Sequence, residues 1–137
     1  MNVYLKSSIA ILVISTLLSG FIFADSDTKE SPYKIWVTAT AYCPCEICCG
    51  KGSPGITKTG TSAKTAGVAI DPKLIPLGSH IDIPGYLRGP NNNGSWILCD
   101  DIGGAIKGNR IDVRFETHSE AKEWGIKRLL IRVHEPE

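Results

Sequence analysis

From residue 34 onward the chain is divided into short apolar runs, which are separated by turns rich in glycine and proline. In residues 79–83 and 110–115 apolar and polar residues alternate, and this is the period of a β-strand that buries one face. No run is long enough for an extended helix. The pattern therefore predicts a mainly β domain whose strands span residues 34–42, 66–70, 79–83, 96–99, 110–115 and 129–133.

Two segments carry helix signals instead. Thr117 is followed three residues later by Glu120, which forms a capping box, and Gly125 is a typical helix end, so a short helix is expected through Trp124. Asp71 precedes Pro72 and is expected to cap a single helical turn. Six short strands with one short helix favour a closed six-stranded barrel, because closure removes exposed strand edges.

The N-terminus has the pattern of an export signal. Lys6 provides a positive charge, the run 7–23 contains no charged residue, and Ala24 precedes a polar stretch. This order is typical of a signal peptide, and retention as an N-terminal membrane anchor is the alternative. We therefore expect a signal or anchor over 1–24, a linker over 25–33 and one domain over 34–137, located outside the cytoplasm as a secreted, periplasmic or cell-wall protein.

The charge balance limits the kinds of molecule that the protein is expected to bind. The 137 residues contain 15 Lys and Arg against 14 Asp and Glu, which gives a formal net charge of +1. A general nucleic-acid binder would need a strong positive field, so that class is not expected. Contact with a membrane is expected only through an uncleaved N-terminal segment, and the domain is expected to be a monomer.

Four of the five cysteines lie close together at Cys43, Cys45, Cys48 and Cys49. In an oxidising compartment such a cluster favours disulfides, with Cys99 as a possible partner from another strand. The spacing of Cys45 and Cys48 also suits a metal knuckle, but a zinc site needs a second pair of ligands. No such pair is visible in the sequence, since the histidines (His80, His118 and His134) lack ligand spacing. Neither a metal nor a cofactor is therefore expected.

Three aspartates, Asp71, Asp101 and Asp112, lie within strands or at their ends. Asp101 ends an apolar strand and precedes Gly103 and Gly104, which leave room for a ligand near the backbone. A carboxyl group among other carboxyl groups in a partly dry cleft suits a general acid. Taken singly, each aspartate has a structural explanation, such as the helix cap at Asp71.

Four segments together give the chain a family resemblance. Residues 38–42, 59–61, 68–78 and 101–113 resemble the 3D domain, a family that is named for three such aspartates, and 118–125 resembles its C-terminal helix. The resemblance implies a double-psi β-barrel related to the catalytic region of membrane-bound lytic murein transglycosylase A. It also implies cleavage of the β-1,4 bond between N-acetylmuramic acid and N-acetylglucosamine in peptidoglycan, leaving a 1,6-anhydro end.

Residue roles follow from the same resemblance. Asp101 matches the catalytic acid, and Asp71 and Asp112 match the aspartates that support it. Peptidoglycan glycan strands are the implied partner. The residues expected to line the sugar cleft are Tyr42, Thr59, Gly60, Gly103, Gly104 and Lys107. The three tryptophans, Trp36, Trp96 and Trp124, are expected in the core.

Two other classes of function stay open. A barrel of this kind can bind glycan in the same cleft without cutting it. A secreted interaction protein would instead use the cysteine-rich loop 43–50 to bind another protein, and would tolerate substitution of Asp101.

Overall fold

The computed structural model describes residues 31–137, so the predicted signal or anchor (1–24) and most of the predicted linker lie outside the described residues. Within the described part, no helix has the length and apolar character that crossing a membrane requires.

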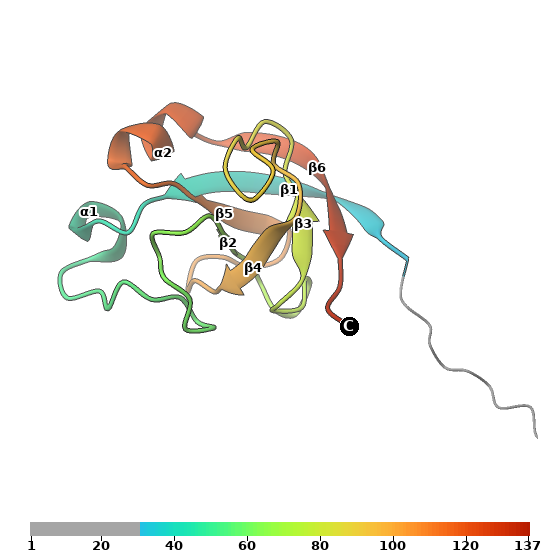
Figure 1. Cartoon of the computed structure of the whole chain (residues 1–137), viewed down its shortest axis with the longest axis horizontal. Helices are drawn as coiled ribbons and strands as arrows, with labels where there is room; N and C mark the ends of the chain where they lie inside the picture. The colour runs from blue at the N-terminus through green and yellow to red at the C-terminus, as the bar shows by residue number, and fades with distance from the viewer. Residues whose placement is uncertain (1–30) are drawn as a thin grey trace, which may run out of the picture.

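The six strands close into a barrel in the order β1-β5-β2-β4-β3-β6 (Figure 1). The β1–β5 and β2–β4 pairs are parallel, and the other four pairs are antiparallel. The predicted mainly β, six-stranded double-psi barrel is therefore confirmed. The strands are β1 (Tyr33–Tyr42), β2 (Val68–Ala69), β3 (His80–Asp82), β4 (Ile97–Asp101), β5 (Arg110–Arg114) and β6 (Lys127–His134).

Residues 31–137 contain two short helices, α1 (Glu46–Cys49) and α2 (His118–Trp124), where one was predicted. The helix α2 carries the expected capping box, and its C-cap is Gly125. The missed helix α1 is a single turn inside the cysteine cluster. Its amides bond back to Cys45 and Glu46, and it ends at Gly50, whose φ of 80° suits glycine. A turn this short has no helical periodicity for sequence reasoning to detect.

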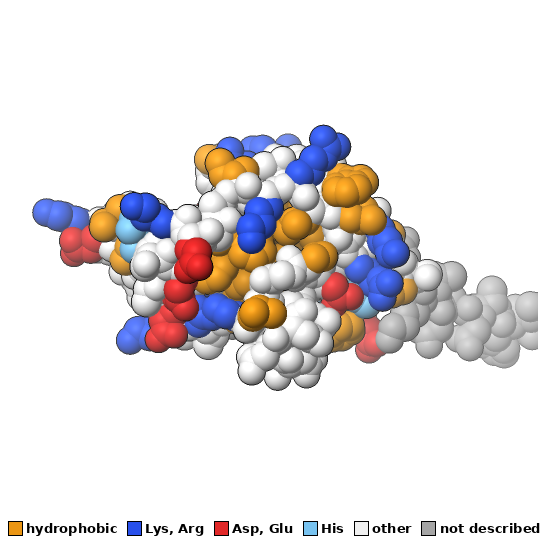
Figure 2. Space-filling view, turned by 90° about the horizontal axis from the view of Figure 1, so that it is seen from above, with side chains coloured by type: hydrophobic (Ala, Val, Ile, Leu, Met, Phe, Trp, Pro, Cys, Tyr) orange, Lys and Arg blue, Asp and Glu red, His pale blue; other side chains and the backbone are white. Residues whose placement is uncertain are grey.

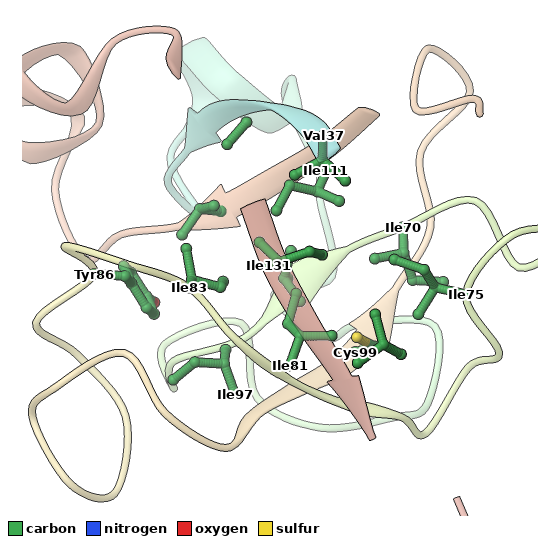
Figure 3. Close-up of a cluster of buried hydrophobic side chains, with 14 of the residues drawn as sticks. Val37, Ile70, Ile75, Ile81, Ile83, Tyr86, Ile97, Cys99, Ile111 and Ile131 are labelled. Carbon is green, nitrogen blue, oxygen red and sulfur yellow. The ribbon is translucent and has the colours of Figure 1, made fainter. Parts of the chain in front are cut away.

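The core follows the strand alternation. Figure 3 shows the aliphatic side chains of the strands meeting inside the barrel, together with the ring of Tyr86 and the sulfur of Cys99. Trp124 packs against this core from α2, as predicted. Trp36 and Trp96 do not, because they are 52% and 48% exposed on the outside of the barrel. Their placement in the core was wrong. Trp36 alternates with the core residue Val37 in β1 and faces outward, whereas Trp96 precedes β4 and has a left-handed backbone with a φ of 60°.

The predicted turn after Asp71 is also present. The amides of Leu74 and Ile75 bond to the Asp71 carbonyl oxygen, and the amide of Lys73 donates to Oδ1 of Asp71 at 3.1 Å. On the face of the molecule seen in Figure 2, basic and acidic side chains are interspersed, which fits the near-zero net charge.

Candidate active site

Strand pairing places Asp101 and Asp112 on either side of Ala69. In the sheet register Ala69 pairs with Asp101 of β4 and with Asp112 of β5. Since neighbouring strands lie about 4.8 Å apart, the two aspartate backbones are separated by roughly 10 Å. The register between β1 and β5 then sets Thr40 opposite Asp112. The barrel thus brings together two of the three predicted aspartates from segments far apart in the sequence.

The Asp101 carboxylate is half-buried and is held by three donors. The Tyr42 hydroxyl donates to Oδ2 at 3.0 Å, and the amides of Lys58 and Ile102 each donate to Oδ1 at 3.0 Å. No Lys, Arg or His lies within ion-pair distance of it among residues 31–137. Asp101 therefore has a fixed orientation but is not neutralised by a counter-ion.

Asp112 lies in a drier environment than most carboxyl groups. The Thr40 hydroxyl donates to its Oδ1 at 2.8 Å. Burial raises the pKa of Asp112, and the nearby charge of Asp101 acts in the same direction, while the Thr40 hydrogen bond and Arg110 oppose the shift. The environment of Asp112 thus favours the protonated, uncharged form of its carboxyl group.

Tyr42 connects Asp101 to a second polar network. Its hydroxyl donates to Asp101 and accepts a hydrogen bond from Nη1 of Arg114 at 3.2 Å. Burial raises the pKa of Tyr42 far above its ordinary value, although the charge of Arg114 opposes the shift. The hydroxyl is therefore protonated at any physiological pH and remains available as a donor.

The second network is a buried ion pair. Nη2 of Arg114 donates to both carboxylate oxygens of Asp100, at 2.8 and 2.6 Å, and Nε donates to the Thr65 carbonyl oxygen. Both side chains are almost fully buried. A Cβ atom on Gly67 would collide with Nη2 and lie 2.7 Å from Oδ1 of Asp100, so only glycine leaves space for this pair.

Asp100 also anchors the loop that carries Thr59 and Gly60. The Thr61 hydroxyl donates to Oδ2 of Asp100 at 2.6 Å, and the Thr59 amide donates to the Asp100 carbonyl oxygen at 3.1 Å. The Thr59 side chain is exposed, and Gly60 adopts a φ of 86° that the tight turn requires. Both predicted residues thus lie on a loop that reaches Asp101 through the Lys58 amide.

The Asp71 side chain hydrogen-bonds to its own turn and to the loop between β4 and β5. Its Oδ1 accepts from the Lys73 amide, and its Oδ2 accepts from the Gly108 amide at 2.8 Å. These hydrogen bonds, with a smaller contribution from the charge of Lys107, lower the pKa of Asp71. Its role in the structure is to fix the loop 102–109 between β4 and β5.

That loop carries the remaining predicted cleft residues. Gly104 and Lys107 are exposed, and no side chain lies where a Cβ on Gly104 would be. Gly103 packs against Ile106, whose amide bonds to the Gly103 carbonyl oxygen. Within the described chain, only Ile102 of this loop hydrogen-bonds to the Asp101 side chain. None of Gly103, Gly104 and Lys107 therefore hydrogen-bonds to the Asp101 carboxylate.

Sequence reasoning missed Arg114, Asp100 and Thr40. Arg114 was expected on the face of β5 opposite the apolar residues, and it is on that face, but the loop 57–67 covers it. Asp100 was treated only as a neighbour of Asp101. Two sequence signals were available. Asp100 and Asp101 are consecutive acids directly before the Gly-rich turn, and Arg114 lies two residues after Asp112, on the same face of a strand.

The cysteine cluster also contains a histidine, which no local sequence pattern indicated. Sγ of Cys43, Cys45 and Cys48 and a ring nitrogen of His118 all lie within 4.8 Å of one another. His118 has no ligand spacing in the sequence, as expected, but α2 brings it to Cys48 across seventy residues. All five cysteines are free thiols, and the suggested pairing of Cys99 is wrong, since that thiol is buried in the core.

A hollow of about 480 Å³ opens elsewhere on the surface, between residues 65–66 and 87–92. None of the three aspartates lines it. Its wall includes Arg88, which forms an ion pair with Glu116 at 3.7 Å.

Comparison with known sequences decides the family. Residues 66–134 match the sequence profile of the 3D domain, which covers half of the chain. The chain belongs to the 3D domain family. The segment matched contains all three aspartates, the buried Asp100–Arg114 pair and the α2 helix.

Curated relatives come from Bacillus subtilis (strain 168). The chain is 35% identical over 116 residues to "Cell wall-binding protein YocH", which covers 80% of this chain and 36% of the relative. It is 38% identical over 111 residues to "Putative cell wall shaping protein YabE", covering 79% of this chain and 25% of the relative. The chain thus spans roughly a quarter to a third of the length of these relatives.

Among solved structures, the E. coli lytic transglycosylase MltA is similar to this 3D domain chain with 22% identity and a TM-score of 0.42. The likeness covers 61% of this chain and 28% of MltA.

Proposed function

We propose that this protein is an extracytoplasmic cell-wall enzyme that cleaves the β-1,4 bond between N-acetylmuramic acid and N-acetylglucosamine in peptidoglycan. The reaction would be that of a lytic transglycosylase, with Asp101 as the catalytic acid and base. Membership of the 3D domain family supports this proposal, and so do the names of the relatives, which refer to binding and shaping of the cell wall.

The observation that carries the proposal is the state of Asp101. It is half-buried and oriented by Tyr42 and two amides, and no Lys, Arg or His among residues 31–137 forms an ion pair with it. The adjacent Asp100, by contrast, has its charge paired with Arg114. Asp101 therefore remains free to exchange a proton with a substrate.

One carboxyl group is sufficient for this reaction. Protonated Asp101 gives its proton to the glycosidic oxygen as the bond from that oxygen to C1 of N-acetylmuramic acid breaks. The C6 hydroxyl of the same sugar then bonds to C1, and the Asp101 carboxylate removes the hydroxyl proton. No water is consumed and Asp101 ends protonated. A hydrolytic glycosidase would need a second carboxyl group at a defined separation to activate water or attack the sugar.

The neighbouring residues have separate roles in this proposal. Tyr42 holds Asp101 in place, and Asp112, whose pKa is raised by burial, provides a second carboxyl group from β5. Asp71 fixes the loop 102–109, which carries Gly103, Gly104 and Lys107 at the rim where a glycan strand would lie. Thr59 and Gly60 border Asp101 on the other side, through the loop anchored by Asp100.

A second candidate is a barrel that binds glycan without cutting it. It is favoured by the name of the relative YocH, a cell wall-binding protein. Both candidates predict that the chain sediments with purified peptidoglycan sacculi, and only the enzyme releases soluble fragments.

The test is product analysis by liquid chromatography and mass spectrometry after incubation of the purified chain with sacculi. The proposal predicts soluble muropeptides with 1,6-anhydro ends. Fragments with reducing ends would contradict the transglycosylase reaction. Sedimentation with sacculi without any soluble product would support the binding module instead.

A further inference from the structure

The cluster of Cys43, Cys45, Cys48 and His118 is not used by the proposed reaction. Three of its members come from the end of β1 and from α1, and the fourth is the first residue of α2. Figure 1 shows α1 and α2 at the same end of the barrel. Two segments that are distant in sequence thus meet through four side chains that can each bind a metal.

The distances match those of a tetrahedral site. Sγ of Cys43 lies 3.4 Å from Sγ of Cys48, and Sγ of Cys48 lies 3.4 Å from Nδ1 of His118. All four ligand atoms lie within 4.8 Å of one another. With Zn–S bonds of about 2.3 Å, tetrahedral geometry separates two sulfurs by about 3.8 Å. A small inward or outward movement of the thiols would therefore enclose a zinc ion.

The backbone around the cluster also suits a metal knuckle. The amides of Cys48 and Cys49 both donate to the Cys45 carbonyl oxygen, so the turn that joins Cys45 to Cys48 has a fixed backbone. Cys43 is buried, and Cys45 and His118 are half-buried, so solvent would reach such a site only in part.

We propose that Cys43, Cys45, Cys48 and His118 form a structural zinc site. Three thiolates and one imidazole fill all four positions of a tetrahedral ion, and closed sites of this type are structural, whereas catalytic sites keep one position open. Binding would release the thiol protons to solvent and would tie α1 to the start of α2. Since Cys43 directly follows Tyr42, the ion would also restrict the strand end that holds Asp101.

The test measures zinc directly and does not depend on any activity. The full chain is purified without chelator from zinc-supplemented cells, and its metal content is determined by inductively coupled plasma mass spectrometry. We expect close to one zinc per chain in the wild type. We expect a large loss of zinc in the His118→Ala and Cys48→Ser variants. The matched control is Cys49→Ser, which removes an adjacent thiol outside the cluster and is expected to retain zinc.

Replacement of zinc by cobalt in the wild type keeps the test valid if a variant fails to fold. Tetrahedral coordination by thiolates and imidazole gives cobalt intense visible absorption, which we expect to observe at one equivalent. Absence of zinc together with a Cys43–Cys48 disulfide in the freshly purified chain would overturn the proposal. Equal zinc content in the folded wild type and the folded His118→Ala variant would also overturn it, because it would show adventitious binding.

Discussion

Asp100 and Asp101 are adjacent in β4, yet they lie in opposite environments. Asp100 is buried, forms two hydrogen bonds with Arg114 and anchors the loop 57–61. Asp101 is half-buried and accepts only neutral donors, from Tyr42 and two amides. Both carboxylates accept a hydrogen bond from the loop 57–61, but only Asp100 is bound by the Arg114 guanidinium. The register between β2 and β4 also shifts here, because consecutive residues of β2 pair with Cys99 and Asp101.

Asp100 and Asp101 therefore differ in what their carboxyl groups can do. A paired and buried carboxylate contributes to the fold, and its proton is not available to a ligand. An unpaired carboxylate held by neutral donors has a defined position and keeps the capacity to exchange a proton. Tyr42 is the only described residue that hydrogen-bonds to both Arg114 and Asp101, so it links the two environments.

The largest effect on stability is expected from breaking the buried pair. Arg114→Met would leave the buried Asp100 charge without a cationic partner, with the Thr61 hydroxyl as its remaining side-chain donor, and this costs about 3–5 kcal/mol of unfolding free energy. Denaturant unfolding measures this loss. The double variant Arg114→Met with Asp100→Asn should recover part of it, because the buried charge is then gone. A loss below about 1 kcal/mol in the single variant would show that the pair is not a stabilising centre.

Removal of the Tyr42 hydroxyl, which hydrogen-bonds to both Asp101 and Arg114, should affect activity more than stability. Tyr42→Phe deletes one hydroxyl that donates to Asp101 and accepts from Arg114. A hydrogen bond to a charged group is worth about 1.5–3 kcal/mol, so release of anhydro-muropeptides should fall by roughly 10- to 100-fold. Product release per unit time and thermal unfolding are measured together. Unchanged release would show that Asp101 does not need this donor.

The space for the buried pair depends on Gly67. In Gly67→Ala the added methyl would meet Nη2 of Arg114, so the guanidinium must move away from Asp100. Overpacking of this kind costs about 1–3 kcal/mol. The matched control is Gly104→Ala, where nothing lies within 4 Å of the added methyl, and its stability should be close to that of the wild type. Equal losses in both variants would argue against the steric account.

The smallest effect is expected on the pH dependence of stability, to which Asp112 and Asp71 contribute. Burial raises the pKa of Asp112, so its folded form binds the proton more tightly, and its contribution to stability falls as pH rises above about 4. Amide hydrogen bonds lower the pKa of Asp71, so its contribution instead rises with pH up to about 4.

The difference in melting temperature between variant and wild type should therefore change in opposite directions for Asp112→Asn and Asp71→Asn between pH 3 and pH 7. For Asp112→Asn it should increase with pH, because the wild type then carries a charge in a dry site. For Asp71→Asn it should decrease with pH, because the wild type gains its amide-bound carboxylate. The same sign for both variants would contradict the assigned environments.

Local patterns predicted most of the barrel. The alternation in 110–115 placed Ile111 and Val113 in the core, and the capping box at Thr117 gave the start of α2. The turn at Asp71 also follows from its sequence. These features depend on neighbours within a few residues, so the sequence is sufficient to predict them.

The site depends on contacts that no local pattern contains. Arg114 is buried only because the loop 57–67 folds over it, and His118 meets Cys48 across seventy residues. The family resemblance indicated the three aspartates, but the structure brings Asp101 and Asp112 together and places Asp71 in a loop anchor. Tertiary folding, which the alternation does not encode, decided each of these outcomes.

The central claim is that Asp101, and not its neighbour Asp100, performs the chemistry. The most direct measurement compares the Asp101→Asn variant with wild type on purified sacculi, quantifying 1,6-anhydro muropeptides by mass spectrometry alongside thermal unfolding. Asp82→Asn, an aspartate outside the site, serves as the control. We predict a loss of roughly 100-fold or more in anhydro product with a folded variant, as expected when a general acid–base group is removed. Undiminished anhydro product from folded Asp101→Asn would contradict the account.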